Sequence, residues 1–304
     1  MSNVLYDAPG PRARRRSLII SVVVILAVAA LVTWLVIQFV SPRVTSIGST
    51  QPPLSDPSRW DIFNDRAVWR DILGGVVNTL KMAGAGAVGA IVIGVLFSFL
   101  RTARTAWIRV PSTVVLEFFR GMPVLLMMLF ILLVFSTEAY WAGAWALAVY
   151  NGAIIGEILR AGVAALPRGQ REAGLTIGLT PLATRFLIEF PQAVRNMLPI
   201  IIAQLVVLLK DTALAYVIAY DELLDTMLRG MRAYYGDRYM FSLFLVCLVI
   251  YLAMNLLLST IARLVARRVR PGAGAARIPR RGKVFDTALA TAQSEPSRPD
   301  SART

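Results

Sequence analysis

The chain contains 304 residues, 57% of them hydrophobic, and carries a formal net charge of +14 at pH 7. Soluble domains hold roughly 45–50% apolar residues, so the composition indicates an integral membrane protein. The sequence contains no histidine, which removes His-based catalytic triads and imidazole metal sites. We therefore expect no catalytic residue, no metal site and no cofactor bound by this chain.

The positive charge lies in short stretches between apolar runs and in the C-terminal tail. Lysine and arginine gather in this way at the cytoplasmic ends of membrane helices, so membrane topology explains the charge and no nucleic-acid partner is expected. The single cysteine, Cys247, falls within an apolar run and is interpreted as a small core side chain.

Residues 1–17 form a basic segment that is predicted to lie in the cytoplasm, and the apolar run at residues 18–40 follows it directly. The apolar part of a secretory signal spans only about 7–15 residues, so we predict a retained membrane helix that runs outward. Residues 41–71 are predicted to form an external loop, with Trp60, Phe63 and Trp69 on one side of a short interfacial helix.

Residues 72–266 are predicted to form the core of the protein, with five further membrane helices. Glycines in the first of them would let neighbouring helices approach closely. The second is expected to be entered through Pro111 and a turn that contains Glu117 and Arg120. The five apolar runs are 74–100, 122–135, 140–158, 194–209 and 239–265, and the glycines stand at positions 84, 86, 89 and 94.

The resulting fold class is an all-α integral membrane protein with six transmembrane helices and both termini in the cytoplasm. The partly polar stretch at residues 210–238 is placed outside. Residues 267–304, rich in Gly, Ala, Pro, Ser and Arg, are predicted to be a disordered basic cytoplasmic tail. Attraction of this tail to anionic lipid and the absence of any partner are both left open.

A polar cytoplasmic loop at residues 166–191 carries the most specific pattern. Residues 169–174 read GQREAG, Gly178 follows after three residues, and Ile188 follows after nine more, before residues 189–191, which read EFP. This resembles the signature of permeases in binding-protein-dependent ATP-binding-cassette (ABC) importers, written EAA, three residues, G, nine residues, I, one residue, LP. Two positions depart from it, because Gly174 replaces the second alanine and Phe190 replaces leucine.

A docking element for a separate ATPase must be a compact helix-turn-helix. Residues 172–177 can form one short helix, Gly178 permits the left-handed turn that ends it, and Pro181 suits the first turn of the next helix. Gly174 is expected to cost that first helix about 1 kcal/mol relative to alanine and to make it less rigid. The docking residues expected from the resemblance are Gly169, Gln170, Glu172, Ala173, Gly174, Gly178, Ile188 and Pro191.

The resemblance extends over residues 69–263 and narrows to the polar amino-acid branch of these permeases, with similarity to actinobacterial glutamate permeases. It rests on residues 78–81 (NTLK), 117–123 (EFFRGMP), 150–157 (YNGAIIGE) and 209–212 (LKDT). It implies the five-helix core of a type I importer, with the N-terminal helix as an addition, in a bacterial cell membrane. It also implies ATPase subunits that bind ATP and Mg²⁺, an extracytoplasmic amino-acid-binding protein, and a homodimer or heterodimer with a second permease in contact with membrane lipids.

Polar residues at membrane depth are candidates for a translocation pathway or gate, because ionisable groups are costly there. Glu157 and Arg160 are spaced i, i+3, and so are Glu117 and Arg120, so local structural ion pairs compete with substrate contact as explanations. Lys210 and Asp211 mark either a broken helix or the water interface. The full set of candidates is Glu117, Arg120, Asn151, Glu157, Arg160, Lys210 and Asp211.

Three other classes of protein remain as alternatives. An ion-coupled secondary transporter of small polar solutes would need no ATPase, an intramembrane enzyme would need a nucleophile and base that the sequence does not offer, and a membrane scaffold would not transport. The chain has no G-x-x-x-x-G-K-[ST] phosphate loop, so ATP hydrolysis is expected from a partner chain.

Overall fold

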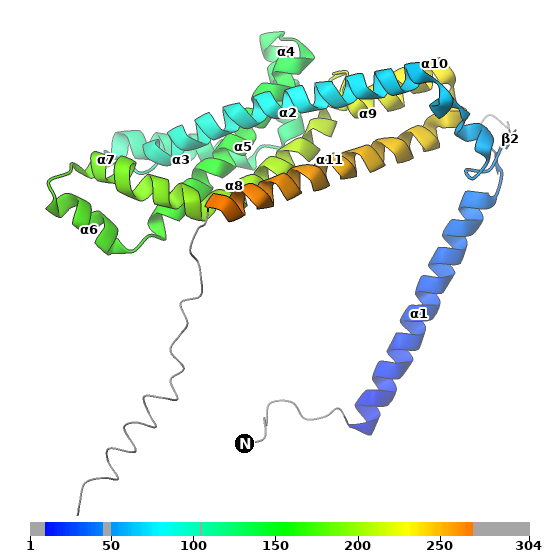
Figure 1. Ribbon diagram of the computed structural model, residues 1–304, viewed down its shortest axis with the longest axis horizontal. Helices are drawn as coiled ribbons and strands as arrows, with labels where there is room; N and C mark the ends of the chain where they lie inside the picture. Colours follow the sequence, from blue (N-terminus) through cyan, green and yellow to red (C-terminus); the bar gives the residue numbers. More distant parts are fainter. Residues whose placement is uncertain (1–9, 45–49, 104, 270–304) are drawn as a thin grey trace, which may run out of the picture.

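The computed structural model describes residues 10–44, 50–103 and 105–269 and is almost entirely helical (Figure 1). One short antiparallel strand pair, β1 (Arg43–Val44) and β2 (Thr50–Gln51), follows the first helix. The helices are α1 (Pro11–Val40), α2 (Arg66–Leu100), α3 (Ala106–Gly121), α4 (Val124–Phe135), α5 (Ala139–Ala164), α6 (Arg168–Thr176), α7 (Pro181–Thr184), α8 (Phe190–Asp211), α9 (Leu223–Asp225), α10 (Arg232–Tyr235) and α11 (Met240–Val269).

The described residues contain enough long apolar helices for a polytopic membrane protein. Two of the helices, α3 and α4, are bent by 104° relative to one another and qualify as a span when taken together. With that pair the described part of the chain has six candidate spans, and the predicted all-α membrane architecture is confirmed. The other five are Pro11–Val40, Arg66–Leu100, Ala139–Ala164, Pro181–Tyr216 and Asp237–Val265.

Helix α1 stands away from the remaining helices (Figure 1), and none of its residues is buried. It meets the bundle at its C-terminal end, where the ring centroids of Phe39 and Phe241 lie 5.7 Å apart. The helix begins at Pro11, seven residues before the predicted start, because proline suits the first turn of a helix and the arginines that follow are good helix formers. Its separation from the bundle agrees with a helix added to a five-helix core.

Close contact between α2 and α5 organises the bundle, and small residues permit it. A Cβ atom added to Gly94 would lie 2.7 Å from Cγ2 of Ile155, and one added to Gly152 would lie 2.7 Å from Cγ2 of Ile93. The same holds at Gly89, where an added Cβ would lie 2.6 Å from the Ala148 methyl. The predicted close approach is therefore confirmed at Gly86, Gly89 and Gly94. It does not hold at Gly84, where an added Cβ meets nothing within 4 Å.

The external segment differs from its prediction. Trp60, Phe63 and Trp69 do not share one short helix, because a turn at Asp61–Asn64 separates Trp60 from the start of α2. Asp65 caps α2 by accepting a hydrogen bond from the Ala67 N–H. Helix α2 therefore begins at Arg66, and Trp69 lies in its first turn. The three rings still pack in sequence, with successive centroids 6.0 Å apart.

The predicted entry to the third span is wrong. Pro111, Glu117 and Arg120 lie within α3, a regular helix, and the chain turns only at Met122 and Pro123. Met122 adopts an extended conformation because it precedes proline, which disfavours the helical region for the residue before it. The pair Glu117 and Arg120 therefore sits on the last turn of a helix.

Residues 212–239 link α8 to α11 through short helical turns, and a buried carboxylate holds them together. Glu222 is fully buried, accepts N–H bonds from Leu224 and Asp225, and accepts the Tyr251 hydroxyl at 2.5 Å. Burial raises the pKa of Glu222, and these donors oppose that effect. Cys247 is buried in α11 beside Leu223, as a core side chain. Most of the predicted tail at residues 267–304 lies outside the described residues. Its first three residues belong to α11, which continues to Val269.

Gly94→Val is expected to lower the free energy of unfolding by about 1–3 kcal/mol, because the new side chain must displace Ile155 or separate α2 from α5. Gly84→Val is the matched control, since a Cβ at Gly84 meets nothing within 4 Å. Thermal unfolding of the purified variants in detergent measures the difference. Equal midpoints for the two variants would contradict the close packing described above.

Candidate functional site

The loop at residues 166–191 forms a hairpin of two short helices, α6 and α7, at the opposite end of the bundle from α10 (Figure 1). Gly178 has a φ of +85°, a left-handed conformation that ends α6. The Thr180 hydroxyl then accepts a hydrogen bond from the Ala183 N–H, and Pro181 occupies the first turn of α7. Both turn features that the sequence predicted are present.

Gly174 has a different effect from the one expected. It is buried, and a Cβ at this position would lie 2.4 Å from Cγ2 of Thr184 and 3.0 Å from Cδ1 of Ile188. The glycine therefore lets α6 pack directly on α7. The expected loss of rigidity follows from helix propensity alone. In the structure, the packing of α6 on α7 determines the effect of this glycine on the rigidity of the hairpin.

A π-helical turn, Arg185–Glu189, joins α7 to α8 without a break. The hairpin is therefore continuous with a membrane span that begins at Pro181, well before the predicted start at residue 194. Arg185 stands at the start of this π-helical turn. Its Nη1 donates to the Thr102 carbonyl oxygen at 3.2 Å, which ties the base of the hairpin to the end of α2.

The remaining docking candidates divide into exposed and packed positions. Gln170 is exposed, and its Oε1 accepts a hydrogen bond from Gln192 Nε2 across the hairpin at 3.1 Å. Apolar side chains beside the turn also remain exposed, including Ile177 at 74% and Leu182 at 69%. An exposed apolar cluster on a protruding hairpin indicates a contact surface. The exposed candidates are Gly169, Gln170, Glu172, Ala173, Gly178 and Pro191, while Gly174 is buried and Ile188 is half-buried.

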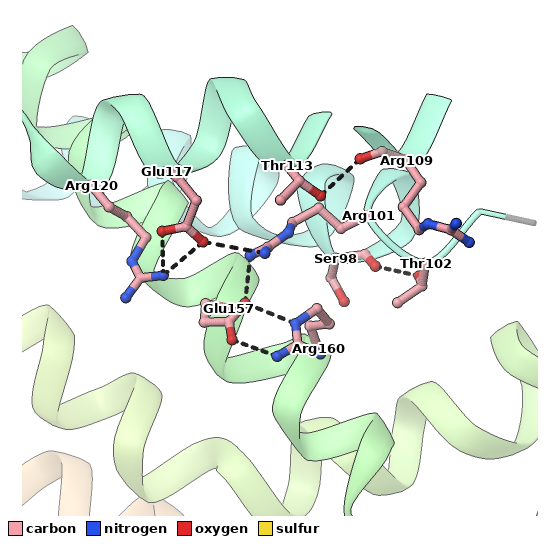
Figure 2. A network of polar contacts seen from close by, with 9 residues as sticks. All are labelled: Ser98, Arg101, Thr102, Arg109, Thr113, Glu117, Arg120, Glu157 and Arg160. Atoms are coloured by element: carbon pink, nitrogen blue, oxygen red, sulfur yellow. Dashed lines mark hydrogen bonds and ion pairs between the residues drawn. The ribbon is translucent and has the colours of Figure 1, made fainter. Parts of the chain in front are cut away.

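An ion-pair network joins three helices beside the hairpin (Figure 2). Arg101, at the end of α2, donates from Nη1 to Glu157 Oε2 at 2.5 Å and from Nη2 to Glu117 Oε1 at 3.2 Å. Arg160 Nη2 donates to Glu157 Oε1 at 2.6 Å, and Arg120 pairs with Glu117 at 3.1 Å. Both i, i+3 pairs suggested by the sequence are present, and Arg101 connects them.

Arg101 is not among the candidates that the sequence suggests, yet it is central to the network. Its side chain is 11% exposed and lies between Glu117 of α3 and Glu157 of α5. No local spacing could reveal this role, because its partners are 16 and 56 residues away. Its neighbour Thr102 receives the Arg185 bond, so the network and the hairpin are attached at adjacent residues.

Asn151 lies apart from this network, in the core of the bundle. It is fully buried in α5, its Nδ2 donates to the Leu147 carbonyl oxygen, and its Oδ1 accepts from Gln204 Nε2 of α8 at 2.8 Å. Buried polar groups at this depth are retained where helices must bond or where a polar molecule passes. The structure thus adds Gln204 to the candidate pathway residues.

Lys210 and Asp211 form the last turn of α8, at the opposite end of this helix from the hairpin. A helix of 22 residues is about 33 Å long, so these two residues are remote from the ion-pair network. The structure therefore separates the pathway candidates into a group around Arg101 at the hairpin end of the bundle, a central pair at Asn151, and a group at Lys210 at the opposite end of α8.

The candidate spans and the protruding hairpin define a polytopic membrane protein, and comparison with known proteins identifies its family. Residues 67–271 match the binding-protein-dependent transport system inner membrane component. The chain belongs to this family of ABC importer permeases.

Characterised relatives and solved structures agree with this assignment. The chain is 35% identical over 226 residues to the glutamate transport system permease protein GluD of Corynebacterium glutamicum, covering 71% of this chain and 82% of the relative. It is 32% identical over 219 residues to the glutamine transport system permease protein GlnP of Escherichia coli, covering 68% and 98%. A crystal structure of an amino acid ABC transporter with histidines superposes with a TM-score of 0.60 at 26% identity, covering 66% of this chain and 95% of that one.

The fold itself recurs in a further structure. A methionine ABC transporter in an inward-facing conformation superposes with a TM-score of 0.57 at 18% identity, covering 68% of this chain and the whole of the other. The family match begins at residue 67 and therefore does not include α1.

Gly174→Ala is expected to destabilise the hairpin by about 1–3 kcal/mol, although alanine is the residue that the family signature carries there. The added methyl group would clash with Thr184, so Gly174→Ala with Thr184→Ala should restore stability. The Thr184 hydroxyl has no hydrogen-bond partner to lose. Gly169→Ala, in open space on the same helix, is the control. Thermal unfolding and proteolysis of the loop report the result, and an unaffected Gly174→Ala single variant would refute the packing role.

Proposed function

We propose that this chain is the permease subunit of an ATP-driven importer of amino acids, glutamate or a related amino acid being the substrate. The observation that carries the proposal is the hairpin at residues 166–191. It combines the family's docking signature with an exposed apolar tip and a continuous helical connection to a membrane span. Its bend at Gly178 gives the compact shape that a partner can push as one unit.

The partner is a separate ATPase that binds ATP and Mg²⁺. The chain has no phosphate-binding loop of its own, and the family match assigns it to a membrane component of a binding-protein-dependent system. Two ATPase subunits would dock on two permeases, either two copies of this chain or this chain with a related one. An extracytoplasmic binding protein would deliver the substrate at the opposite end.

The contacts around Arg101 suggest how force from the hairpin reaches the bundle. Motion of α7 moves Arg185, which is bonded to Thr102 at the end of α2. Arg101, the preceding residue, holds α3 and α5 through Glu117 and Glu157. A displacement of the hairpin is thus transmitted to three helices together. Alternating access then follows from rocking of these helices about the pathway.

The amino-acid substrate is supported by the names of the relatives, which include a glutamate permease and a glutamine permease. The polar pair of Asn151 and Gln204 in the bundle core offers amide groups that suit the polar ends of an amino acid. The orientation with both termini in the cytoplasm is supported by arginines near the inner ends of α1, α2 and α11. A secondary transporter is the rival, and it would need no partner ATPase.

Glu172→Lys and Gly178→Pro are expected to abolish uptake and substrate-stimulated ATP hydrolysis by the assembled transporter. Glu172 is exposed on the hairpin, so reversing its charge disturbs a docking contact and leaves the fold intact. Proline cannot adopt the positive φ of Gly178. ATP hydrolysis and uptake in proteoliposomes, at matched protein levels, measure both effects.

Two control variants accompany this test. Glu138→Lys makes the same charge change at an exposed residue outside the hairpin. Gly178→Asn replaces the glycine by a residue that also tolerates the left-handed conformation. Both should retain at least half of the activity. Unchanged transport in the Glu172→Lys and Gly178→Pro variants would exclude the hairpin as the coupling element.

A further inference from the structure

We infer that a cavity between the docking hairpin and the helix bundle binds the phosphate group of an anionic membrane phospholipid. The cavity has a volume of about 650 Å³ and lies among the ends of α2, α3 and α5 and the hairpin. Its cytoplasmic placement rests on the proposed function, whereas its chemistry follows from the side chains that line it. An ATPase carboxylate or a soluble anion in the same place are outcomes that the experiment below separates.

The lining of this cavity is strongly basic. It contains six arginines and two glutamates. Two of the arginines are already paired with Glu157, so four arginines against two glutamates leave an excess of two positive charges. Arg101 and Arg160 pair with Glu157, but the other four arginines make no ion pair with any described residue. Such an excess in a confined space attracts a multivalent anion, and guanidinium groups bind phosphate oxygens in a bidentate manner. The four unpaired arginines are Arg109, Arg168, Arg171 and Arg185.

A second cavity indicates that the ligand is amphipathic. It has a volume of about 330 Å³, shares Arg171 and Arg185 with the first, and adds the apolar side chains of Phe99, Pro181 and Leu182. The Phe99 ring stacks on Phe186 with centroids 4.8 Å apart, and Phe186 is 56% exposed. The basic cavity therefore opens toward an apolar surface on which an acyl chain can lie.

Both cavities lie beside the ends of candidate membrane spans, where the headgroup layer of a bilayer is expected. One membrane span ends at Leu100, directly before Arg101, and another begins at Pro181, close to Arg185. Basic pockets between membrane helices at the cytoplasmic surface bind acidic lipid headgroups. A soluble anion would satisfy the charge but would leave the apolar wall without a partner, so the geometry favours a lipid.

A bound headgroup would have a mechanical consequence. It would bridge Arg171 and Arg185 of the hairpin to Arg109 of α3, across the gap that the Arg185 bond to Thr102 already spans. The coupling path would then include a lipid, and coupled ATP hydrolysis would depend on the anionic lipid content of the membrane.

The direct test measures lipid retention by the full-length permease, purified from membranes and placed in nanodiscs of phosphatidylcholine and phosphatidylglycerol. Native mass spectrometry counts the phosphatidylglycerol molecules that stay bound. The double variant Arg109→Gln, Arg171→Gln removes two of the guanidinium groups that would contact the phosphate and should retain about tenfold less, which corresponds to about 1.4 kcal/mol of binding free energy. Arg14→Gln with Arg15→Gln removes the same charge from α1 and should retain the wild-type level. Equal retention by the two double variants would overturn the proposal.

Two further arms identify the source of the anion. Inorganic phosphate added to the permease in pure phosphatidylcholine should leave its thermal stability unchanged, whereas phosphatidylglycerol should raise it; stabilisation by phosphate alone would refute the lipid. Addition of the ATPase should leave the bound lipid in place, and its release would assign the arginines to the ATPase. Lipid retention is measured on the permease alone, without ATP or partner chains. A negative result there would overturn the lipid site and leave the docking proposal standing. Conversely, Glu172→Lys should lose docking and still retain the lipid.

Discussion

The structure depends on one constraint, the near contact of the α2 and α5 backbones. Glycines at 89, 94 and 152 leave no room for a side chain at this contact, so the two helices have a fixed register. That register brings Arg101, at the end of α2, within 2.5 Å of Glu157 on α5. Glu117 of α3 then has a cation to pair with, which holds α3 against the same corner. The ion-pair network is therefore a product of helix packing as much as of charge.

The hairpin uses this rigid corner as its base. Arg185 bonds the Thr102 carbonyl oxygen beside Arg101, and the π-helical turn carries the hairpin into α8 without a break. A transporter needs a docking element that is stiff in itself and firmly attached to the helices it moves. Gly174 contributes the stiffness by letting α6 lie on α7, and the Arg185 bond contributes part of the attachment. The basic cavity beside it offers a second attachment through a lipid.

The sequence predicted what depends on local conformation and on charge order. The turn at Gly178, the start of α7 at Pro181 and the pairing of Glu157 with Arg160 all follow from short-range rules. Features that depend on residues distant in the chain were missed, such as the role of Arg101 and the packing of Gly174 on Thr184. The turn before the third span was predicted too early in the chain. Helix α3 continues as a regular helix past Pro111 to Gly121, and the chain turns only at Met122 and Pro123. The proposed glutamate substrate comes from the names of relatives and from no geometry in this chain.

The central claim is that the hairpin at residues 166–191 contacts an ATPase and moves with it. A photoreactive amino acid at Ile177, which is 74% exposed beside the turn, tests this in the assembled transporter. The account predicts a covalent adduct with the ATPase whose yield changes when ATP binds. The same probe at Leu133, equally exposed on α4, should give no such adduct. An ATPase adduct absent at Ile177, or formed equally at both positions, would contradict the account.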